Sequence, residues 1–338
     1  MGASYGTSFG VAPGYPDYGP TGTSKFIPVK WSTKLVEKFY DASVLTHISN
    51  TNYEGEIKGM GSVVEIRTRG TVPVYLNRYQ KGMKLWPSDD VESPSIELYI
   101  DQNTVFRFGI DEIDKYQSDI NLMSEWAEDA TNNEKVAIDT DVLAYLCGTT
   151  PYSTSQIDSY NCGATAGKVS QMYNLGTSGA PVQITSSNIL AYFAIIKAVL
   201  REYNIPDDGS LFFVIPEVMG ALLNMSDIKD ASMTGDASST LRSGRIGRIL
   251  NVTTYGCNHL PMGSGSAGTD PTTGKACWYC LFGHPLGLTF ADQFTRLQYI
   301  DNPEETFGNY IKSLHVYGRK VIKSSALGVV YAQPMLNI

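Results

Sequence analysis

Charged side chains are scarce in this sequence. Asp, Glu, Lys and Arg make up 18% of the 338 residues, whereas an average soluble domain has roughly 25%. Much of the surface must therefore be neutral, which suits a subunit that buries a large part of itself against copies. The same shortfall also fits loops that are rich in Gly, Ser and Tyr, so both explanations stay open.

Clusters of positive charge are missing as well. The net charge is −8, and the densest basic stretches are Arg242–Arg248 and Arg319–Lys323. Tight binding of nucleic acid needs clustered Lys and Arg side chains that neutralise phosphates. The composition therefore argues against a dedicated DNA-binding protein. It suits a container whose inner surface does not bind the contents tightly.

Cysteines are few, and long apolar runs are absent. The sequence has five cysteines, an odd number, and they are not arranged as a dense framework. This argues against a disulfide scaffold. No run approaches the roughly 18 apolar residues of a membrane span, and the first residues show no basic region followed by an apolar stretch. We therefore expect no membrane span, no signal peptide and synthesis in the cytoplasm.

A long two-stranded arm is predicted in the first third of the chain. Residues 1–24 are mostly Gly, Tyr, Pro, Ser and Thr, and such a segment cannot bury enough surface to offset its ordering entropy. Apolar residues then alternate within Val63–Arg67, Val72–Leu76 and Ser95–Ile110, which is the period of strands. A tight turn is expected at Gly70 and Thr71. A hairpin of this length has too little core to be stable alone, so we expect it to lie on a neighbouring molecule.

The remaining pattern mixes helix and strand periods, which predicts an α+β fold. The most prominent element is a helix over Asp114–Leu146, a segment without Pro or Gly and about 45 Å long at 1.5 Å rise per residue. The other predicted elements are helices over residues 31–47, 187–203 and 216–225, and strands over residues 210–215, 241–252, 275–288 and 313–332.

One group of residues has the composition of a metal site. Cys257, His259, Cys277 and Cys280 are a possible four-ligand zinc set. However, Cys277 and Cys280 lie in the apolar run Ala276–Phe282, where residues three apart on a strand face opposite ways, and buried cysteines are common core residues. We favour core packing and keep a zinc-binding or redox enzyme as the alternative of another class.

Two glycine-rich motifs do not meet the requirements of nucleotide binding. Gly263–Gly268 matches the dinucleotide pattern, but the residues that follow it cannot start an apolar helix. Gly163–Val169 is one residue short of a phosphate loop and has Val169 where a hydroxyl is needed. We therefore predict no catalytic residue, no cofactor site and no metal site.

The order of these elements resembles that of the major capsid proteins of tailed double-stranded DNA bacteriophages, which share the Hong Kong 97-type fold. Local patterns that are similar to the family occur at Phe26–Ser32, Asn52–Ile57, Gly61–Arg67, Pro206–Pro216, Leu241–Val252 and Asn258–Pro261. The resemblance implies an N-terminal arm at residues 1–50, an extended β-hairpin loop at 51–98 and an axial domain at 185–312. A peripheral domain with a long spine helix would comprise residues 99–184 and 313–338.

The resemblance implies that the protein has a structural role and is not an enzyme. Copies of the chain would form pentamers and hexamers of an icosahedral shell, with each extended hairpin lying over the next subunit and the arm packing beneath. The shell would enclose double-stranded DNA without sequence-specific binding, and scaffolding, portal and cement proteins would be its partners. Assembly would take place in the host bacterial cytoplasm, and the protein would then be located in the virion capsid. An encapsulin-like compartment shell has the same fold and is the alternative, although the long extension and loose arm argue against it.

Five residues are candidates for contacts between subunits, because aromatic side chains dominate interface energetics. They lie in or next to the extended loop: Tyr75, Tyr79, Leu85, Trp86 and Tyr99. Tyr99 suits packing within the base of the hairpin equally well.

Overall fold

A computed structural model describes most of the chain. The described residues are 43–52, 63–70, 72–76, 81–82, 90, 93–112, 122–226, 248–265, 268–301 and 308–335. Most of the expected N-terminal arm and the candidates Tyr79, Leu85 and Trp86 lie outside these ranges.

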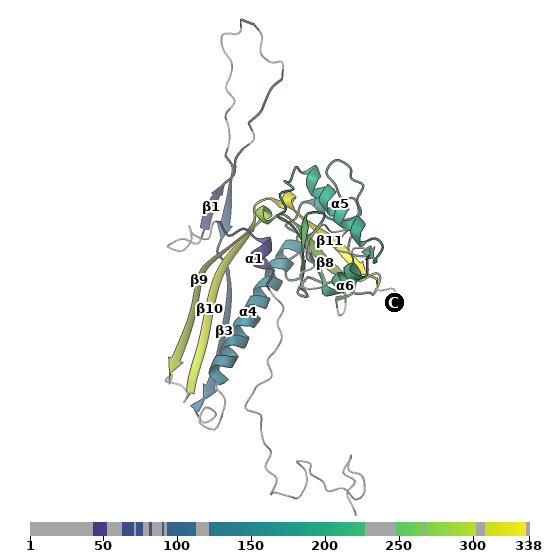
Figure 1. Cartoon of the computed structure of the whole chain (residues 1–338). Coiled ribbons are helices and arrows are strands. Elements are labelled where there is room, and N and C mark those ends of the chain that lie inside the picture. Colours follow the sequence, from purple (N-terminus) through teal and green to yellow (C-terminus); the bar gives the residue numbers. More distant parts are fainter. Residues whose placement is uncertain are drawn as a thin grey trace, which may run out of the picture.

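A mixed six-stranded sheet forms the centre of the body (Figure 1). Its order is β4 (Val182–Ile184), β11 (Leu327–Pro334), β8 (Trp278–Gly283), β5 (Leu211–Ile215), β7 (Val252–Gly256) and β6 (Arg248–Ile249). The β4–β11 and β5–β7 pairs are parallel, and the others are antiparallel. All five residues of β5 are buried, as expected for a strand that is covered on both faces of its sheet.

Helices cover both faces of this sheet. On one face, α5 (Ile189–Glu202) and α6 (Glu217–Met225) pack against alternate residues of β5, and the rings of Phe193 and Phe213 meet edge to face at 5.2 Å. On the other face, α1 (Leu45–Ile48) and the C-terminal part of α4 (Leu122–Cys147) bury Ile48 and Leu146 against Phe212. The result is a three-layer core.

A second, three-stranded sheet runs away from the body beside α4 (Figure 1). Its antiparallel strands have the order β3 (Gln102–Asp111), β10 (Gly308–Val321) and β9 (Leu288–Asp301). The helix packs on one face, where the Phe108 and Trp126 rings lie 6.3 Å apart and Thr104 Oγ1 donates a hydrogen bond of 2.6 Å to Glu134. The helix predicted over Asp114–Leu146 is present as α4. Residues 113–121, which include its predicted start, lie outside the described residues.

The extension begins with a short antiparallel ladder. Strand β1 (Val63–Arg67) pairs with β2 (Ser95–Tyr99), and in Figure 1 β1 lies at the upper end of the three-stranded sheet. Ile66, Leu98 and Ile100 form a small third core with Ala291 of β9. The base of the extension is therefore held by the three-stranded sheet.

One strand prediction is wrong. Residues 72–75 have no regular secondary structure, and Val63–Arg67 pairs with Ser95–Tyr99 and not with Val72–Leu76. A two-residue period identifies a strand but not its partner, which explains this error. The structure places β9 in the three-stranded sheet and β11 in the six-stranded sheet. The domain boundaries stay a prediction.

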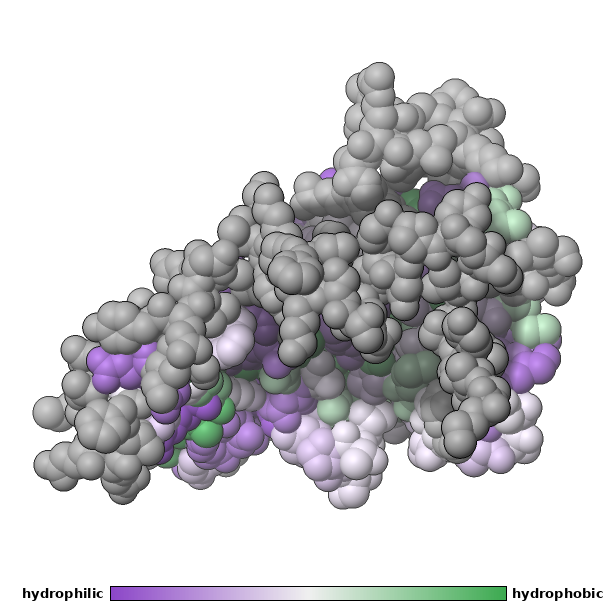
Figure 2. All heavy atoms as spheres, turned by 90° about the horizontal axis from the view of Figure 1, so that it is seen from below, coloured by the Kyte–Doolittle hydropathy of each residue, from purple (hydrophilic) through white to green (hydrophobic). Residues whose placement is uncertain are grey.

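None of the described helices combines the length and the hydropathy that a membrane span requires. In the view of Figure 2, the described surface carries small groups of hydrophobic side chains (green) between hydrophilic ones (purple).

Candidate subunit-contact surfaces

The extension presents one buried and one exposed face at its base. Residues that lie directly opposite each other in an antiparallel pair point to the same side. The pair Val64 and Leu98 faces the small core, and Leu98 is fully buried. The pair Val63 and Tyr99 points outward, and Tyr99 is 48% exposed. Tyr99, one of the predicted contact residues, therefore faces outward from the base of the hairpin.

Two carboxylates face each other on the outward side of this ladder. Glu65 lies directly opposite Glu97, and both side chains are exposed. The Tyr99 hydroxyl donates a hydrogen bond to Glu97, and this bond and the charge of Glu97 raise the pKa of Tyr99. Among the described residues, no ion pair joins Glu65 or Glu97 to a cation. Like charges that lie directly opposite in a sheet are destabilising.

Exposed apolar side chains continue beyond the ladder. Val74 and Leu76 are 85% and 88% exposed, and Val72 and Tyr75 are exposed as well. Scattered apolar residues are ordinary on a protein surface, but here four of five consecutive residues are exposed and apolar. Val72, Val74 and Leu76 were not among the predicted contact residues, because their alternation was assigned to a strand.

The three-stranded sheet has an open face opposite α4. Arg107 of β3 lies directly across from Lys312 of β10, and Val105 lies across from Leu314 in the next row. All four side chains are exposed, Val105 by 68%. Arg296 of β9 lies across from Leu314 and is exposed too. This face therefore combines an apolar pair with three cations.

The proposed zinc set is not brought together. Cys257 packs in the core on the α4 side of the six-stranded sheet, whereas Cys280 packs on the opposite side, with its Sγ 3.5 Å from Sδ of Met219. The Cys277 thiol donates a hydrogen bond of 3.3 Å to the Lys275 carbonyl oxygen. The described residues contain no group of three or more His, Cys, Asp or Glu side chains that could hold a metal ion. The enzyme alternative thereby loses its four-ligand site.

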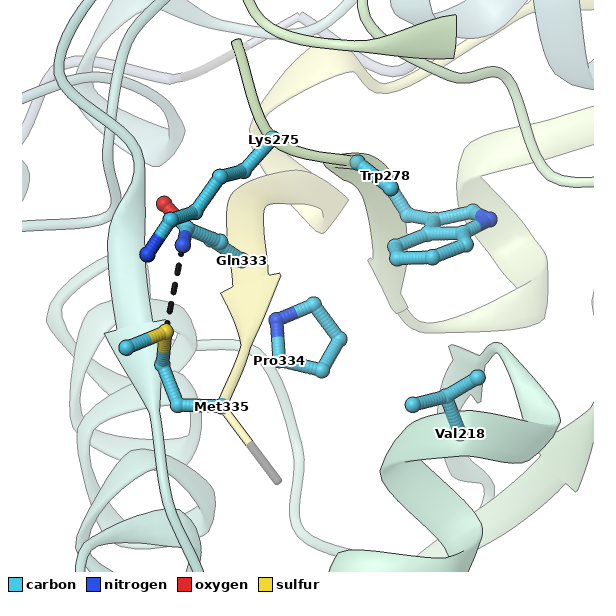
Figure 3. A pocket seen from close by; sticks show the side chains of 7 residues that line it. Val218, Lys275, Trp278, Gln333, Pro334 and Met335 are labelled. Atoms are coloured by element: carbon cyan, nitrogen blue, oxygen red, sulfur yellow. Dashed lines mark hydrogen bonds between the residues drawn. The ribbon is translucent and has the colours of Figure 1, made fainter. Parts of the chain in front are cut away.

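One pocket opens where α6, β8 and β11 meet (Figure 3). Its volume is about 330 Å³, and its lining consists of Val218, Lys275, Ala276, Trp278, Gln333, Pro334 and Met335. The Gln333 side-chain amide donates a hydrogen bond of 3.1 Å to Sδ of Met335, as the dashed line shows. One amine and one amide among apolar groups do not form the acid–base pair that proton-transfer chemistry needs.

Comparison with solved structures shows which fold this is. A chain from Mycobacterium phage Che8 has 22% sequence identity and a TM-score of 0.68, and the match covers 90% of this chain and 97% of that one. The capsid structure of cyanophage P-SCSP1u has 12% identity and a TM-score of 0.65, covering 92% and 94% of the two chains. The capsid of Ralstonia phage GP4 has 12% identity and a TM-score of 0.65, covering 94% and 98%.

No family model and no curated protein matches the sequence. The likeness is therefore one of fold, and it extends over almost the whole of each chain. It confirms the fold predicted from the sequence: this α+β chain has the Hong Kong 97-type fold of phage capsid structures.

Proposed function

We propose that this chain is the major capsid protein of a tailed double-stranded DNA phage and builds the icosahedral shell around the genome. The observation that carries the proposal is the fold match with phage capsids over at least 90% of this chain and of each solved chain. The role is structural, and the protein is a component of the virion. Copies of the chain are its main partners, in pentamers and hexamers. Scaffolding, portal and cement proteins, and assembly in the host cytoplasm, belong to the same proposal.

The shape of the extension supports self-association. Its base is fixed by the small core around Leu98, but Val72, Val74, Tyr75 and Leu76 gain no comparable burial within the described part of the chain. Burying apolar surface stabilises by about 25 cal/mol per Å², so each of these side chains would contribute about 1–2 kcal/mol at a contact with another copy. Tyr75 and Tyr99 remain proposed contact residues on this basis, and Tyr79, Leu85 and Trp86 on their sequence alone.

Electron microscopy of the purified protein tests the proposal. We expect closed shells or shell fragments from the wild-type chain, and a folded monomer that forms no shells when residues 70–94 are deleted. A milder variant, Val72→Ser, Val74→Ser and Leu76→Ser together, should also lose shells and keep its circular dichroism spectrum.

A matched control is available in another exposed loop. Val169 and Met172 are 81% and 80% exposed, so Val169→Ser with Met172→Ser removes a similar apolar area elsewhere. Assembly should survive in this control. A wild-type chain that stays monomeric under all assembly conditions would contradict the proposal. Shells that co-purify with an enzyme instead of a genome would favour the encapsulin-like alternative.

A further inference from the structure

The outward face at the base of the extension carries a charge imbalance. Glu65 and Glu97 lie directly opposite each other, at a Cβ separation of about 4.5–5.5 Å for such pairs. Arg67 is on the same face one row further along, but it forms no ion pair with either carboxylate among the described residues. An opposing cationic surface would remove this repulsion.

The open face of the three-stranded sheet carries the opposite imbalance. Arg107 and Lys312 are directly opposite each other across β3 and β10, and Arg296 lies one row away on β9. The Arg107 guanidinium lies 4.8 Å from the centroid of the Tyr310 ring. This cation–π contact positions the guanidinium and leaves its positive charge in place. One carboxylate, Asp111, sits at the far end of this face, two rows from Arg107.

The two surfaces also match in spacing. On the extension, the row next to the acidic pair is the apolar pair Val63 and Tyr99. On the sheet, the row next to the basic pair is the apolar pair of Val105 and Leu314. Both surfaces are built on antiparallel strand pairs. The distance between directly opposite residues is therefore similar in the two, and successive rows of side chains on one face are about 7 Å apart in both. An apolar pair can therefore meet an apolar pair while two carboxylates meet two cations.

This contact cannot form within one chain. The inward face of the extension is already packed on its own three-stranded sheet through Leu98 and Ala291, so its outward face points away from that sheet. A second copy of the chain offers such cations on the open face of its three-stranded sheet.

We propose that Glu65 and Glu97 of one subunit dock on Arg107 and Lys312 of a second copy, with Arg296 at the edge of the contact. The inference deepens the proposed function, on which it rests, by naming the two surfaces that meet. Charge pairs of this kind set register and specificity between partners, and exposed pairs weaken with salt. The contact therefore also makes shell formation sensitive to ionic strength.

Charge reversal with rescue tests the pairing. Glu65→Lys with Glu97→Lys, and separately Arg107→Glu with Lys312→Glu, should each lower the assembled fraction at least about tenfold. The variant with all four substitutions should return to within about twofold of wild type, because each pair is then restored with its signs exchanged. Sedimentation measures the assembled fraction, and circular dichroism checks that these exposed substitutions leave the fold intact.

Glu125→Lys with Glu128→Lys is the control for Glu65→Lys with Glu97→Lys, because it makes the same change in net charge at exposed positions of α4. It should assemble like wild type. Loss of assembly in this control as well would assign the effect to net charge and overturn the pairing, as would normal assembly of either charge-reversed variant. Failure of the four-residue variant to recover would also overturn it. Failure of the wild-type chain to assemble would instead count against the proposed function.

Discussion

Arg319 of β10 and Asp141 of α4 form an ion pair that fixes the long helix to the three-stranded sheet. The Arg319 side chain is only 4% exposed, and its guanidinium lies over the rings of Tyr145 and Tyr152, at 4.6 and 5.0 Å from their centroids. Asp141 also accepts hydrogen bonds from the hydroxyls of Tyr152 and Tyr317, at 2.6 and 2.9 Å. Burial lowers the pKa of Arg319 to about 10, so the guanidinium remains charged at neutral pH.

Removing the carboxylate should therefore be costly. Asp141→Leu removes the carboxylate that pairs with the buried Arg319 and leaves only the charge of Asp101 acting on it, so we expect the free energy of unfolding to fall by about 3–5 kcal/mol. Denaturant unfolding of the unassembled protein measures this change. The double variant Asp141→Leu with Arg319→Met should be less destabilised than Asp141→Leu alone, because no buried charge is left. Equal stability of Asp141→Leu and wild type would show that the pair does not hold the helix.

Gly318 permits the close approach between the extension and the sheet. A Cβ atom at this position would lie 2.6 Å from the backbone oxygen of Tyr99 and 3.0 Å from the Ile100 side chain. Gly318→Val should therefore push β2 away from β10, at a cost of about 1–3 kcal/mol. Hydrogen exchange should become faster at the amides of residues 95–99 and stay unchanged in β5. Unchanged exchange in both regions would mean that the base of the extension does not depend on this contact.

Local patterns in the sequence were sufficient for one helix and one strand at the centre of the six-stranded sheet, but not for β4, which lies in a stretch without a strand pattern. The helix predicted over residues 187–203 is α5 (Ile189–Glu202), and the strand predicted over 210–215 is β5 (Leu211–Ile215). In both, the apolar spacing reports burial against neighbours on one or both sides. The partners of β9 and β11 could not be predicted in this way, since strand pairing depends on residues far apart in the chain.

The candidate contact surfaces show the same limit. Tyr75 and Tyr99 were predicted as contact residues because they are aromatic, and both side chains are exposed. The acidic pair of Glu65 and Glu97 was not predicted, because it exists only in the register of β1 with β2. The basic pair on the open sheet face likewise requires the register of β3 with β10, which joins residues about 200 positions apart. Charge clusters that form across paired strands do not appear as runs of charged residues in the sequence.

Asp270 should make the protein less stable in acid. Burial alone would raise its pKa, but hydrogen bonds from the backbone of Gly179, Thr273 and Thr272 and from the Tyr331 hydroxyl outweigh this and lower the pKa to about 2. A carboxyl whose pKa is depressed in the folded state stabilises the fold above its unfolded pKa of about 3.9, and this contribution is lost as the pH falls toward 2.

The variant Asp270→Asn isolates this effect. We expect it to lower the Tm by about 2–5 °C at pH 7. The uncharged amide keeps one acceptor oxygen, and its NH2 group replaces the carboxylate oxygen that accepts either from Gly179 or from Thr272 and Thr273. The difference in Tm between wild type and variant should be widest above pH 4 and should shrink as the pH approaches 2. Thermal unfolding at several pH values measures it. A difference that stays constant over this range would show that the ionised carboxylate is not what holds the turn.

The five cysteine thiols should react in an order set by burial. Cys147, Cys257, Cys277 and Cys280 are buried, whereas Cys162 is partly exposed. Burial raises the pKa of Cys147 to about 12 and also raises that of Cys280, so few thiolates are present at pH 8 and reagents cannot reach them. Ellman's reagent should modify Cys162 first, at least about tenfold faster than the others, and Cys162→Ser should abolish the early phase. Fast modification of Cys257, Cys277 and Cys280 in the native protein would instead reveal an accessible reactive cluster and reopen the zinc or redox alternative.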